Sequence, residues 1–370
     1  AHLPDNYFSA DGNDTGTQLR TKIEQAFEAA TRRVTSGTAA AVTSQTRSGE
    51  GAVYQALFFP PTSSESGQAI APPWTGQVHA MLVDANGTIH EDTNHNYFLD
   101  SGDMAITFSG DNIYRYYIGN ATVEALNNVQ EINFLWSSTP LLNGLDDSQA
   151  ISQRDYDDDN DNSRYIFTFA DEGDDGLVTS AAEVQAFTED KCQLAPDNFC
   201  NFLTLYESSS GQLGTPASTG TDSADLATLA DRQVNFIRGA DVGNETYGSY
   251  TDIARSRGLN ATITNWRLGD VVYSSPTIVG APAENYHTLY QDSSYREFYN
   301  KYKYRRQVLY VGANDGMLHA FNGGFYNSSI SGFELSQGGN AAHPLGKELW
   351  AYAPYNLLPH LRWLMNPEYG

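Results

Sequence analysis

The sequence contains no apolar run of about 18 residues, so no segment is predicted to span a bilayer as a helix. Basic residues are scarce: 21 Lys and Arg stand against 45 Asp and Glu, which gives a formal net charge of −24. Nucleic acids and anionic membrane surfaces repel such a chain, so both are excluded as expected partners, whereas cations are favoured. No basic and apolar leader precedes Ala1, so we expect that any signal peptide has been removed.

The motifs of common enzyme classes are also absent. The sequence has no HExxH zinc motif, no GxSxG nucleophile elbow, no Walker loop and no GxGxxG turn. Its eight histidines are scattered, and His319 is predicted to be a packed residue within a strand. We therefore expect a protein that is not an enzyme.

Only two cysteines are present, Cys192 and Cys200, in the stretch KCQLAPDNFC. They form neither a CxxC nor a CxxCH pattern, so redox catalysis and haem attachment have no local support. The spacing favours a disulfide that closes a small loop, worth about 2–3 kcal/mol, in an oxidising, exported compartment. The alternative is two unpaired thiols in a loop.

What the sequence does contain is typical of β-sheet. It has 32 glycines and 23 tyrosines, with 40% apolar and 12% aromatic residues, enough to build buried cores over 370 residues. Strands are expected at residues 52–59, 78–83, 104–108 and 113–118, and Asn86-Gly87 is typical of a hairpin turn. We predict a fold that is mainly β with minor α, in two or three domains.

The best candidate for a site is segment 92–103, DTNHNYFLDSGD. Oxygen-bearing side chains occupy positions 1, 3, 5, 9 and 12 of this loop, and position 7 offers a main-chain carbonyl: Asp92, Asn94, Asn96, Asp100, Asp103 and Phe98. Calcium takes six to eight oxygen ligands from a tightly curled loop, so this spacing predicts a Ca²⁺ site. Tyr97 stands where glycine is usual, and the flanking residues look like strands. The alternative is an Asn/Asp-rich turn held by its own hydrogen bonds.

Two further acidic segments are weaker candidates for Ca²⁺. In segment 171–183, DEGDDGLVTSAAE, the expected ligands are Asp171, Asp175, the Leu177 carbonyl and Glu183, and the alternative is the capped start of a helix. In segment 155–161, carboxylates gather at Asp155, Asp157, Asp159 and Asp161, with Asp158 among them. Their mutual repulsion would keep this loop open without a counter-ion. The alternative is a solvated acidic loop.

Segment 306–323, RQVLYVGANDGMLHAFNG, predicts two strands joined by a tight Asn-Asp-Gly turn, and GKELW at 346–350 predicts a third strand. This pattern is typical of quinoprotein-like β-propeller blades, in which the tryptophan packs on a glycine-rich turn. With GDVVYSSPTIVGAP at 269–282, it resembles the start of the C-terminal propeller of PilY-type proteins, which are type IV pilus tip-associated adhesin and biogenesis factors.

The resemblance implies four segments. Residues 1–37 would be the strand and helix that end a von Willebrand factor A-like domain, although its metal-dependent adhesion motif Asp-x-Ser-x-Ser is absent. Residues 38–135 would be a β-rich module with a calcium loop, and 136–265 an acidic irregular region with calcium loops and the cysteine loop. Residues 266–370 hold about two blades at ~40–45 residues each, too few to close a ring. We therefore expect a piece of a longer protein, or blades supplied by another chain.

The function that the resemblance implies is adhesion to host or abiotic surfaces and pilus assembly, in contact with minor pilins. The protein would be exported through the periplasm to the pilus tip or cell surface, stabilised by Ca²⁺. One alternative is a structural calcium-dependent module of a filament or surface layer, and another is a fragment of a quinoprotein dehydrogenase. The Tyr-rich segment 286–304 is either a binding surface or a helix that covers the propeller.

Overall fold

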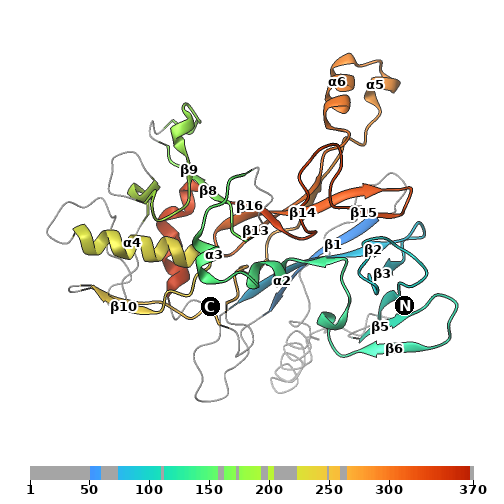
Figure 1. Ribbon diagram of the computed structural model, residues 1–370, viewed down its shortest axis with the longest axis horizontal. Helices are drawn as coiled ribbons and strands as arrows, with labels where there is room; N and C mark the ends of the chain where they lie inside the picture. The colour runs from blue at the N-terminus through green and yellow to red at the C-terminus, as the bar shows by residue number, and fades with distance from the viewer. Residues whose placement is uncertain are drawn as a thin grey trace, which may run out of the picture.

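The computed structural model describes residues 51–59, 74–109, 112–156, 162–171, 175–192, 199–203, 223–247, 250–258 and 265–366. Within these ranges the chain is mainly β-sheet with some helices, as predicted, and most strands belong to two sheets (Figure 1). The predicted strand and helix of segment 1–37 lie outside the described residues. In the described part of the chain, no helix is both long and apolar enough to cross a membrane.

The first sheet has seven strands, six from the predicted β-rich segment 38–135 and one from the start of segment 136–265. They are β1 (Gly51–Phe59), β2 (Thr75–Val83), β3 (Ile89–His90), β4 (Ala105–Ser109), β5 (Asn112–Tyr116), β6 (Val123–Leu126) and β7 (Trp136–Ser137). Strands β1 to β6 lie side by side in chain order, each antiparallel to the next, and β7 pairs with β2. The turn at Asn86-Gly87 joins β2 to β3 in a longer loop than predicted, because the Asp84 carboxylate accepts the N–H groups of Asn86 and Thr88.

The second sheet also has seven strands, drawn from both predicted segments 136–265 and 266–370. They are β8 (Ile166–Phe169), β9 (Val184–Ala186), β12 (Thr277–Val279), β13 (Gln307–Ala313), β14 (Met317–Asn327), β15 (Gly332–Glu334) and β16 (Glu348–Ala353). The order is β12-β13-β14-β16-β8-β9, with β15 paired to β14. The pairing of β16 with β8 is parallel, and the other pairings are antiparallel.

The predicted hairpin and third strand are confirmed as β13, β14 and β16. Only Gly316 of the Asn-Asp-Gly turn is left-handed, at φ 85°, which is the usual geometry of a three-residue hairpin loop. Four antiparallel strands, β12-β13-β14-β16, match the content of a propeller blade. Because β8 and β9 extend the same sheet, the assignment as a propeller blade stays a prediction.

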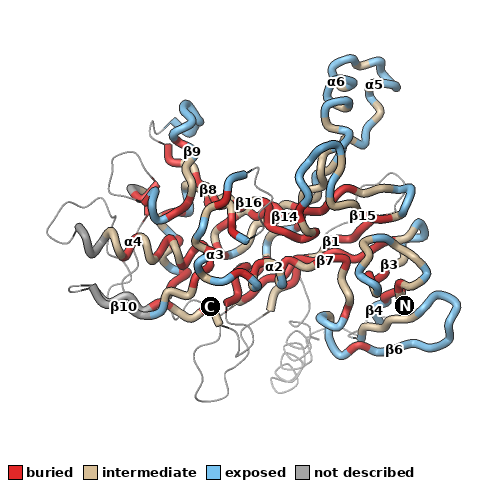
Figure 2. The backbone as a smooth tube through the Cα atoms, viewed as in Figure 1, coloured by how far each residue is buried: buried red, intermediate tan, exposed pale blue. Residues whose placement is uncertain are grey.

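The two sheets pack against each other through a shared apolar core. Tyr54 of β1 and Val78 of β2 belong to the same buried cluster as Leu309 and Val311 of β13 and Phe321 of β14. Figure 2 shows buried residues running along β1 and β14, where the two sheets meet. Burial of apolar side chains is the main favourable term in folding, so this shared core joins the two described sheets into one body.

The sequence predicts that Trp350 packs on a glycine-rich turn, but in the structure Trp136 packs on the glycine. Trp350 of β16 lies beside Tyr310, with ring centroids 5.6 Å apart. Trp136 of β7 instead packs on Gly346, whose φ is 76° and where an added Cβ would lie 2.7 Å from the indole. Gly346 is therefore required both for its left-handed backbone and for the space that Trp136 fills.

Helices cover one end of the second sheet. Helix α4 (Ser223–Arg238) buries Leu229, Val234 and Ile237 against the 3₁₀ helix η4 (Tyr355–Met365). The predicted disulfide between Cys192 and Cys200 is present in the same cluster. Short elements connect the rest: η1 (Val129–Glu131), α2 (Ser138–Asn143), α3 (Asp147–Ile151), η2 (Ala181–Glu183), η3 (Phe199–Asn201), and the hairpin β10 (Asn244–Tyr247) with β11 (Tyr250–Ile253).

The Tyr-rich insert forms an arm between β12 and β13. Its helices α5 (Tyr286–Leu289) and α6 (Ser293–Tyr302) contain no buried residue and project from the body (Figure 1). The interpretation of this segment as a helix that covers a sheet is therefore wrong. The rings contact one another instead, as in the pair Tyr286 and Tyr295 with centroids 5.2 Å apart.

Candidate metal loops and a buried charge network

The loop 92–103, here called the first aspartate loop, connects β3 to β4. The Asp92 carboxylate is fully buried and accepts the N–H groups of Asn96 at 3.0 Å and Tyr97 at 3.1 Å. The Asn96 side chain accepts the N–H of Phe98 at 3.0 Å, and Tyr97 is left-handed at φ 69°. The predicted positions 1, 5, 6 and 7 thus form one tight curl around the first carboxylate.

A second carboxylate closes the first aspartate loop. Asp103 is 4% exposed and accepts the N–H groups of Thr93 and Asp100, both at 2.9 Å. Burial raises the pKa of Asp92 and of Asp103, and the nearby charges of Asp100 and Asp92 add to the rise at Asp103. Buried carboxylates that raise one another's pKa are stabilised by a cation, and all predicted donors are the hard oxygens that calcium prefers. By donor chemistry, the loop fits calcium.

The first aspartate loop also docks on the second sheet. Main-chain hydrogen bonds join Leu99 to Ser331 at 3.0 Å and Phe333 to Tyr97 at 2.8 Å. Phe98 pairs with Gly332 of β15 as an isolated bridge, and an added Cβ at Gly332 would lie 2.6 Å from the Phe98 Cα. The predicted ligand loop is therefore also a structural link between the two sheets.

The loop 171–183, here called the second aspartate loop, connects β8 to β9 and repeats the same pattern. Asp171 accepts the N–H groups of Asp175 at 3.2 Å and Gly176 at 2.8 Å. The Asp175 side chain accepts the N–H of Leu177 at 2.8 Å, and Gly176 is left-handed at φ 71°. Residues 172–174 lie outside the described ranges, so position 3 of this loop is not compared.

The end of the second aspartate loop is a 3₁₀ turn followed by a strand. Glu183 accepts the N–H groups of Thr179 at 2.6 Å and Ser180 at 2.8 Å, which forms a capping box. These hydrogen bonds hold the pKa of Glu183 below its usual value, although the charge of Asp171 opposes them. The alternative, a capped helix start, is thus present as one short 3₁₀ turn capped by Ser180, and the chain continues as strand β9 from Val184.

The acidic segment 155–161 is described only in part. Asp155 is described, whereas the predicted ligands Asp157, Asp159 and Asp161 lie outside the described residues. Where the chain is described, no three His, Cys, Asp or Glu side chains are already grouped as metal ligands. The carboxylates of both aspartate loops accept main-chain N–H groups instead. The Ca²⁺ assignments at all three segments therefore stay predictions.

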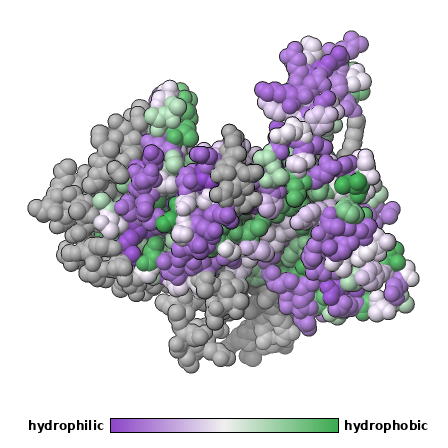
Figure 3. Space-filling view, viewed as in Figure 1, coloured by the Kyte–Doolittle hydropathy of each residue, from purple (hydrophilic) through white to green (hydrophobic). Residues whose placement is uncertain are grey.

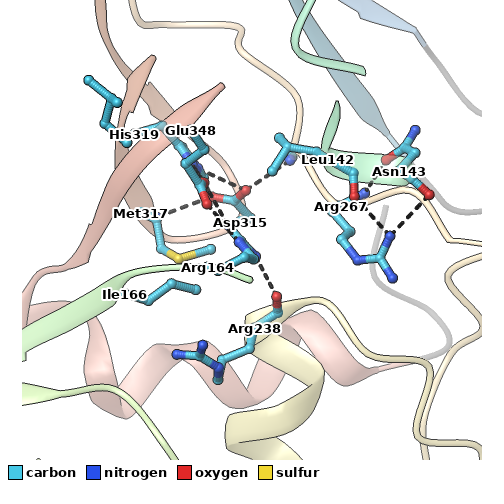
Figure 4. A network of polar contacts seen from close by, with 12 residues as sticks. Leu142, Asn143, Arg164, Ile166, Arg238, Arg267, Asp315, Met317, His319 and Glu348 are labelled. Atoms are coloured by element: carbon cyan, nitrogen blue, oxygen red, sulfur yellow. Dashed lines mark hydrogen bonds and ion pairs between the residues drawn. The ribbon is translucent and has the colours of Figure 1, made fainter. Parts of the chain in front are cut away.

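A buried charge network lies under the hairpin of β13 and β14 (Figure 4). His319 is fully buried, with Nδ1 2.8 Å from Glu348 and Nε2 3.1 Å from Asp315. Glu348 also pairs with Arg164 through two hydrogen bonds of 2.7 Å, and Arg164 donates to the Arg238 carbonyl. His319 is thus a packed residue, as predicted, but one that is ionised.

The pKa values follow from these contacts. Burial alone would lower the pKa of His319, but the two carboxylates outweigh it and raise the pKa to about 9. Burial alone would raise the pKa of Glu348, but Arg164 and His319 hold it below its usual value. The four side chains, the fourth being Asp315, carry two positive and two negative charges, so the network is balanced inside the core.

Comparison with known proteins gives two relatives with the same description. A "Type IV pilus biogenesis factor PilY1 homolog" of Xylella fastidiosa (strain Temecula1 / ATCC 700964) is 31% identical over 175 residues, which are 46% of this chain and 11% of that protein. The predicted resemblance to PilY-type proteins is confirmed. A second PilY1 homolog from the same strain is 27% identical over 220 residues, which are 56% of this chain and 12% of that protein.

The chain thus spans about a tenth of the length of these PilY-type relatives. No family model matches the chain. No solved structure matches it either. The relationship to PilY-type proteins therefore comes from sequence similarity, and the geometry above belongs to this chain alone.

Buried arginines link distant parts of segment 136–265 to one another and to Arg267, which neither the PilY-type resemblance nor the sequence indicated. Arg238 donates to the carbonyls of Phe187 at 2.8 Å and Ser152 at 2.7 Å, and Arg267 donates to Leu142 at 2.9 Å. Burial lowers the pKa of Arg238 to about 9 and that of Arg267 to about 10. These side chains satisfy carbonyl groups that regular structure would otherwise satisfy.

Proposed function

We propose that this chain is an exported, calcium-stabilised segment of a type IV pilus biogenesis factor, which acts by binding rather than by catalysis. The similarity to two PilY1 homologs is the observation that carries the pilus assignment. The disulfide Cys192–Cys200 supports an oxidising compartment, such as the periplasm or the cell surface. The finer assignment is a place at the pilus tip, where the whole protein would contact minor pilins and promote adhesion.

The calcium part of the proposal is supported by the first aspartate loop. Two buried carboxylates with raised pKa values, Asp92 and Asp103, lie in one loop together with Asp100. The same loop holds residues 97–99 against residues 331–333 of the second sheet. Calcium would neutralise the carboxylates and so tighten the contact between the sheets. At calcium concentrations about 100-fold above Kd, the expected gain is about 2.7 kcal/mol.

The test of calcium compares thermal unfolding of the chain in excess calcium and in excess chelator. Wild type should unfold at a lower temperature in chelator. Asp92→Asn should lose most of this calcium-dependent shift, because it removes the carboxylate at position 1. Asp292→Asn is the matched control, since Asp292 also accepts a main-chain N–H, from Tyr295 at the start of α6. A wild-type protein with the same midpoint in both buffers would contradict the calcium proposal.

The test of the pilus assignment uses the full-length protein in its own cell. Deleting the segment that corresponds to residues 51–366 should reduce surface piliation and surface attachment. The Asp92→Asn variant of the full-length protein should reduce both less than the deletion does. Normal piliation and attachment in the deletion strain would contradict the assignment while leaving the calcium result unaffected.

A further inference from the structure

A cavity of about 570 Å³ opens at the foot of the arm. Its walls come from the start of β13, from β16, from residues 339–343 and from residues 154–156. This volume is within the range of roughly 300–1,000 Å³ that is typical of sites for small ligands. The cavity lies away from both aspartate loops, since none of their residues lines it.

Part of the cavity lining is cationic. Arg154, Arg305 and Arg306 line it together with His343, and no Asp or Glu is among the described residues of the lining. The chain as a whole has more than twice as many acidic as basic residues, so this composition is the reverse of the average. A pocket of this kind attracts an anion and repels cations.

The arginines are positioned by neutral oxygen atoms. Arg305 donates through Nε to the Gly280 carbonyl at 2.9 Å, and Arg306 donates to the Asn322 side chain at 2.7 Å. These contacts fix each guanidinium in place. Arg305 uses both Nε and Nη2 on the Gly280 carbonyl, and Arg306 also donates through Nη2 to the Ala341 carbonyl. Each guanidinium thus presents a fixed positive charge that attracts a carboxylate.

Another part of the cavity lining is aromatic. Tyr310 and Trp350 both line it and are half-buried, with ring centroids 5.6 Å apart and planes 47° apart. Tyr156, which is 60% exposed, completes this wall. Burial raises the pKa of Tyr310, while the charge of Arg305 opposes the rise, which places the cation near the phenol. Half-exposed rings offer flat apolar faces with polar edges.

We propose that this cavity binds an acidic saccharide, a sugar ring that carries a carboxylate. The arginines bind the carboxylate, and the Tyr310 and Trp350 rings pack on the apolar C–H face of the sugar. Asn340, also in the lining, supplies an amide for hydroxyl groups. The cavity thus combines aromatic faces and an anion site within one lining. This site is separate from the two aspartate loops and does not depend on them, and it shares Tyr156 with the acidic segment 155–161.

The arm adds to the attraction. Residues 301–306, at the end of the arm next to the cavity, include Lys301, Lys303, Arg305 and Arg306 and no acidic residue. Figure 3 shows that the arm is largely hydrophilic and stands clear of the body. A positive patch beside the opening should speed the approach of an anionic ligand, with an on-rate that falls as salt is added.

The test titrates the calcium-loaded chain with a trimer of galacturonic acid and follows binding by calorimetry. The expected result is binding that weakens by about tenfold or more in Arg305→Gln, because a charge-assisted hydrogen bond is lost. The glutamine amide can still donate to the Gly280 carbonyl, so the backbone contact is kept. Arg296→Gln is the matched control: it makes the same change in an exposed residue of α6 outside the cavity, and its affinity should stay within about twofold of wild type.

Two more ligands and one more variant complete the test. A neutral maltotriose should not bind, and a triglutamate peptide should bind at least about tenfold more weakly than the acidic trimer, since it lacks a ring to stack. In Trp350→Phe the trimer should bind more weakly. The change in tryptophan fluorescence that the trimer causes on binding should also be smaller than in wild type. Equal binding of the neutral sugar, equal binding of the peptide, or unchanged affinity in a folded Arg305→Gln protein would each overturn the proposal.

Discussion

The two aspartate loops have the same internal geometry, but the first docks on another sheet whereas the second exposes apolar side chains to solvent. In each, the first aspartate accepts the N–H groups of positions 5 and 6, position 5 accepts the N–H of position 7, and position 6 is left-handed. The first loop, in the first sheet, docks on β15. The second loop, in the second sheet, exposes Leu177 and Val178, each by more than 60%.

The difference shows what a loop sequence encodes and what its environment adds. Position 6 of the second loop is Gly176, which adopts a left-handed backbone without cost. Position 6 of the first loop is Tyr97, for which the same backbone costs about 1–2 kcal/mol. Tyr97 is kept there by packing against the core between the sheets and by the hydrogen bond from Phe333. Docking thus stabilises a residue that the loop alone would disfavour.

The largest expected effect concerns ion pairs, which are buried in the second sheet and exposed in the first. Glu348→Gln leaves Arg164 buried without its charge partner, so the free energy of unfolding should fall by about 3–5 kcal/mol. Glu124→Gln, in the first sheet, weakens an exposed pair with Arg115 and should change stability little. Urea denaturation of both variants checks this. Equal losses in the two variants would contradict it.

The second largest effect is expected at alkaline pH, which should destabilise the second sheet. The pKa of His319 is raised from 6.5 to about 9, so its contribution is complete below about pH 6.5 and is lost as the pH rises through about 9. The slope over this window is roughly 1.4 kcal/mol per pH unit at most. Urea denaturation across the window measures it. His319→Gln is the control, and a slope that persists in this variant would exclude His319 as its source.

Gly332→Ala should undock the first aspartate loop from the second sheet. The added Cβ would meet main-chain atoms, at 2.6 Å from the Phe98 Cα and 2.8 Å from the Tyr97 carbonyl oxygen, so we expect a loss of about 1–3 kcal/mol. Gly312→Ala is the control, because a Cβ there meets only Ser274 at 3.6 Å. Thermal melts in calcium and in chelator should show a smaller calcium effect in Gly332→Ala. Identical melts for the two variants would argue against docking.

The smallest effect concerns position 6 of the second loop. Gly176→Ala puts a side chain on a left-handed residue with open space around it, so only the backbone cost of about 1 kcal/mol should appear. Gly176→Asn should cost less, because asparagine tolerates this backbone. Chemical denaturation distinguishes the two. If alanine costs no more than asparagine, Gly176 is not required for its backbone conformation.

Local features of the fold were predictable from sequence because they depend on neighbouring residues. The spacing of Asp92, Asn96 and Asp103 predicted a curled loop between strands, and the turn before Gly316 predicted the hairpin. The cysteine spacing predicted the disulfide. Each of these patterns closes within about a dozen residues, so the chain's own sequence indicates it directly.

The remaining features join residues that are far apart in sequence. Nothing near Tyr97 indicates that Gly332 will face it, and nothing near His319 indicates that Arg164 will complete its network. The cavity under the arm likewise unites Arg154 with Arg305 and Trp350. Arginines in an acidic chain are ordinarily assigned to the surface, so their use inside the core gave no sequence signal.

The parallel pairing of β8 with β16 also bears on how the molecule is made. Ile166 aligns with Ala351, so the edge of β8 waits for a partner strand that emerges much later in the sequence. A protein that crosses a membrane N-terminus first would keep this edge unpaired throughout transit, a state prone to aggregation. Contacts so distant in sequence also form slowly. Completion of the second sheet would thus come well after β8 has been made, which makes a holding chaperone on the far side of the membrane advantageous.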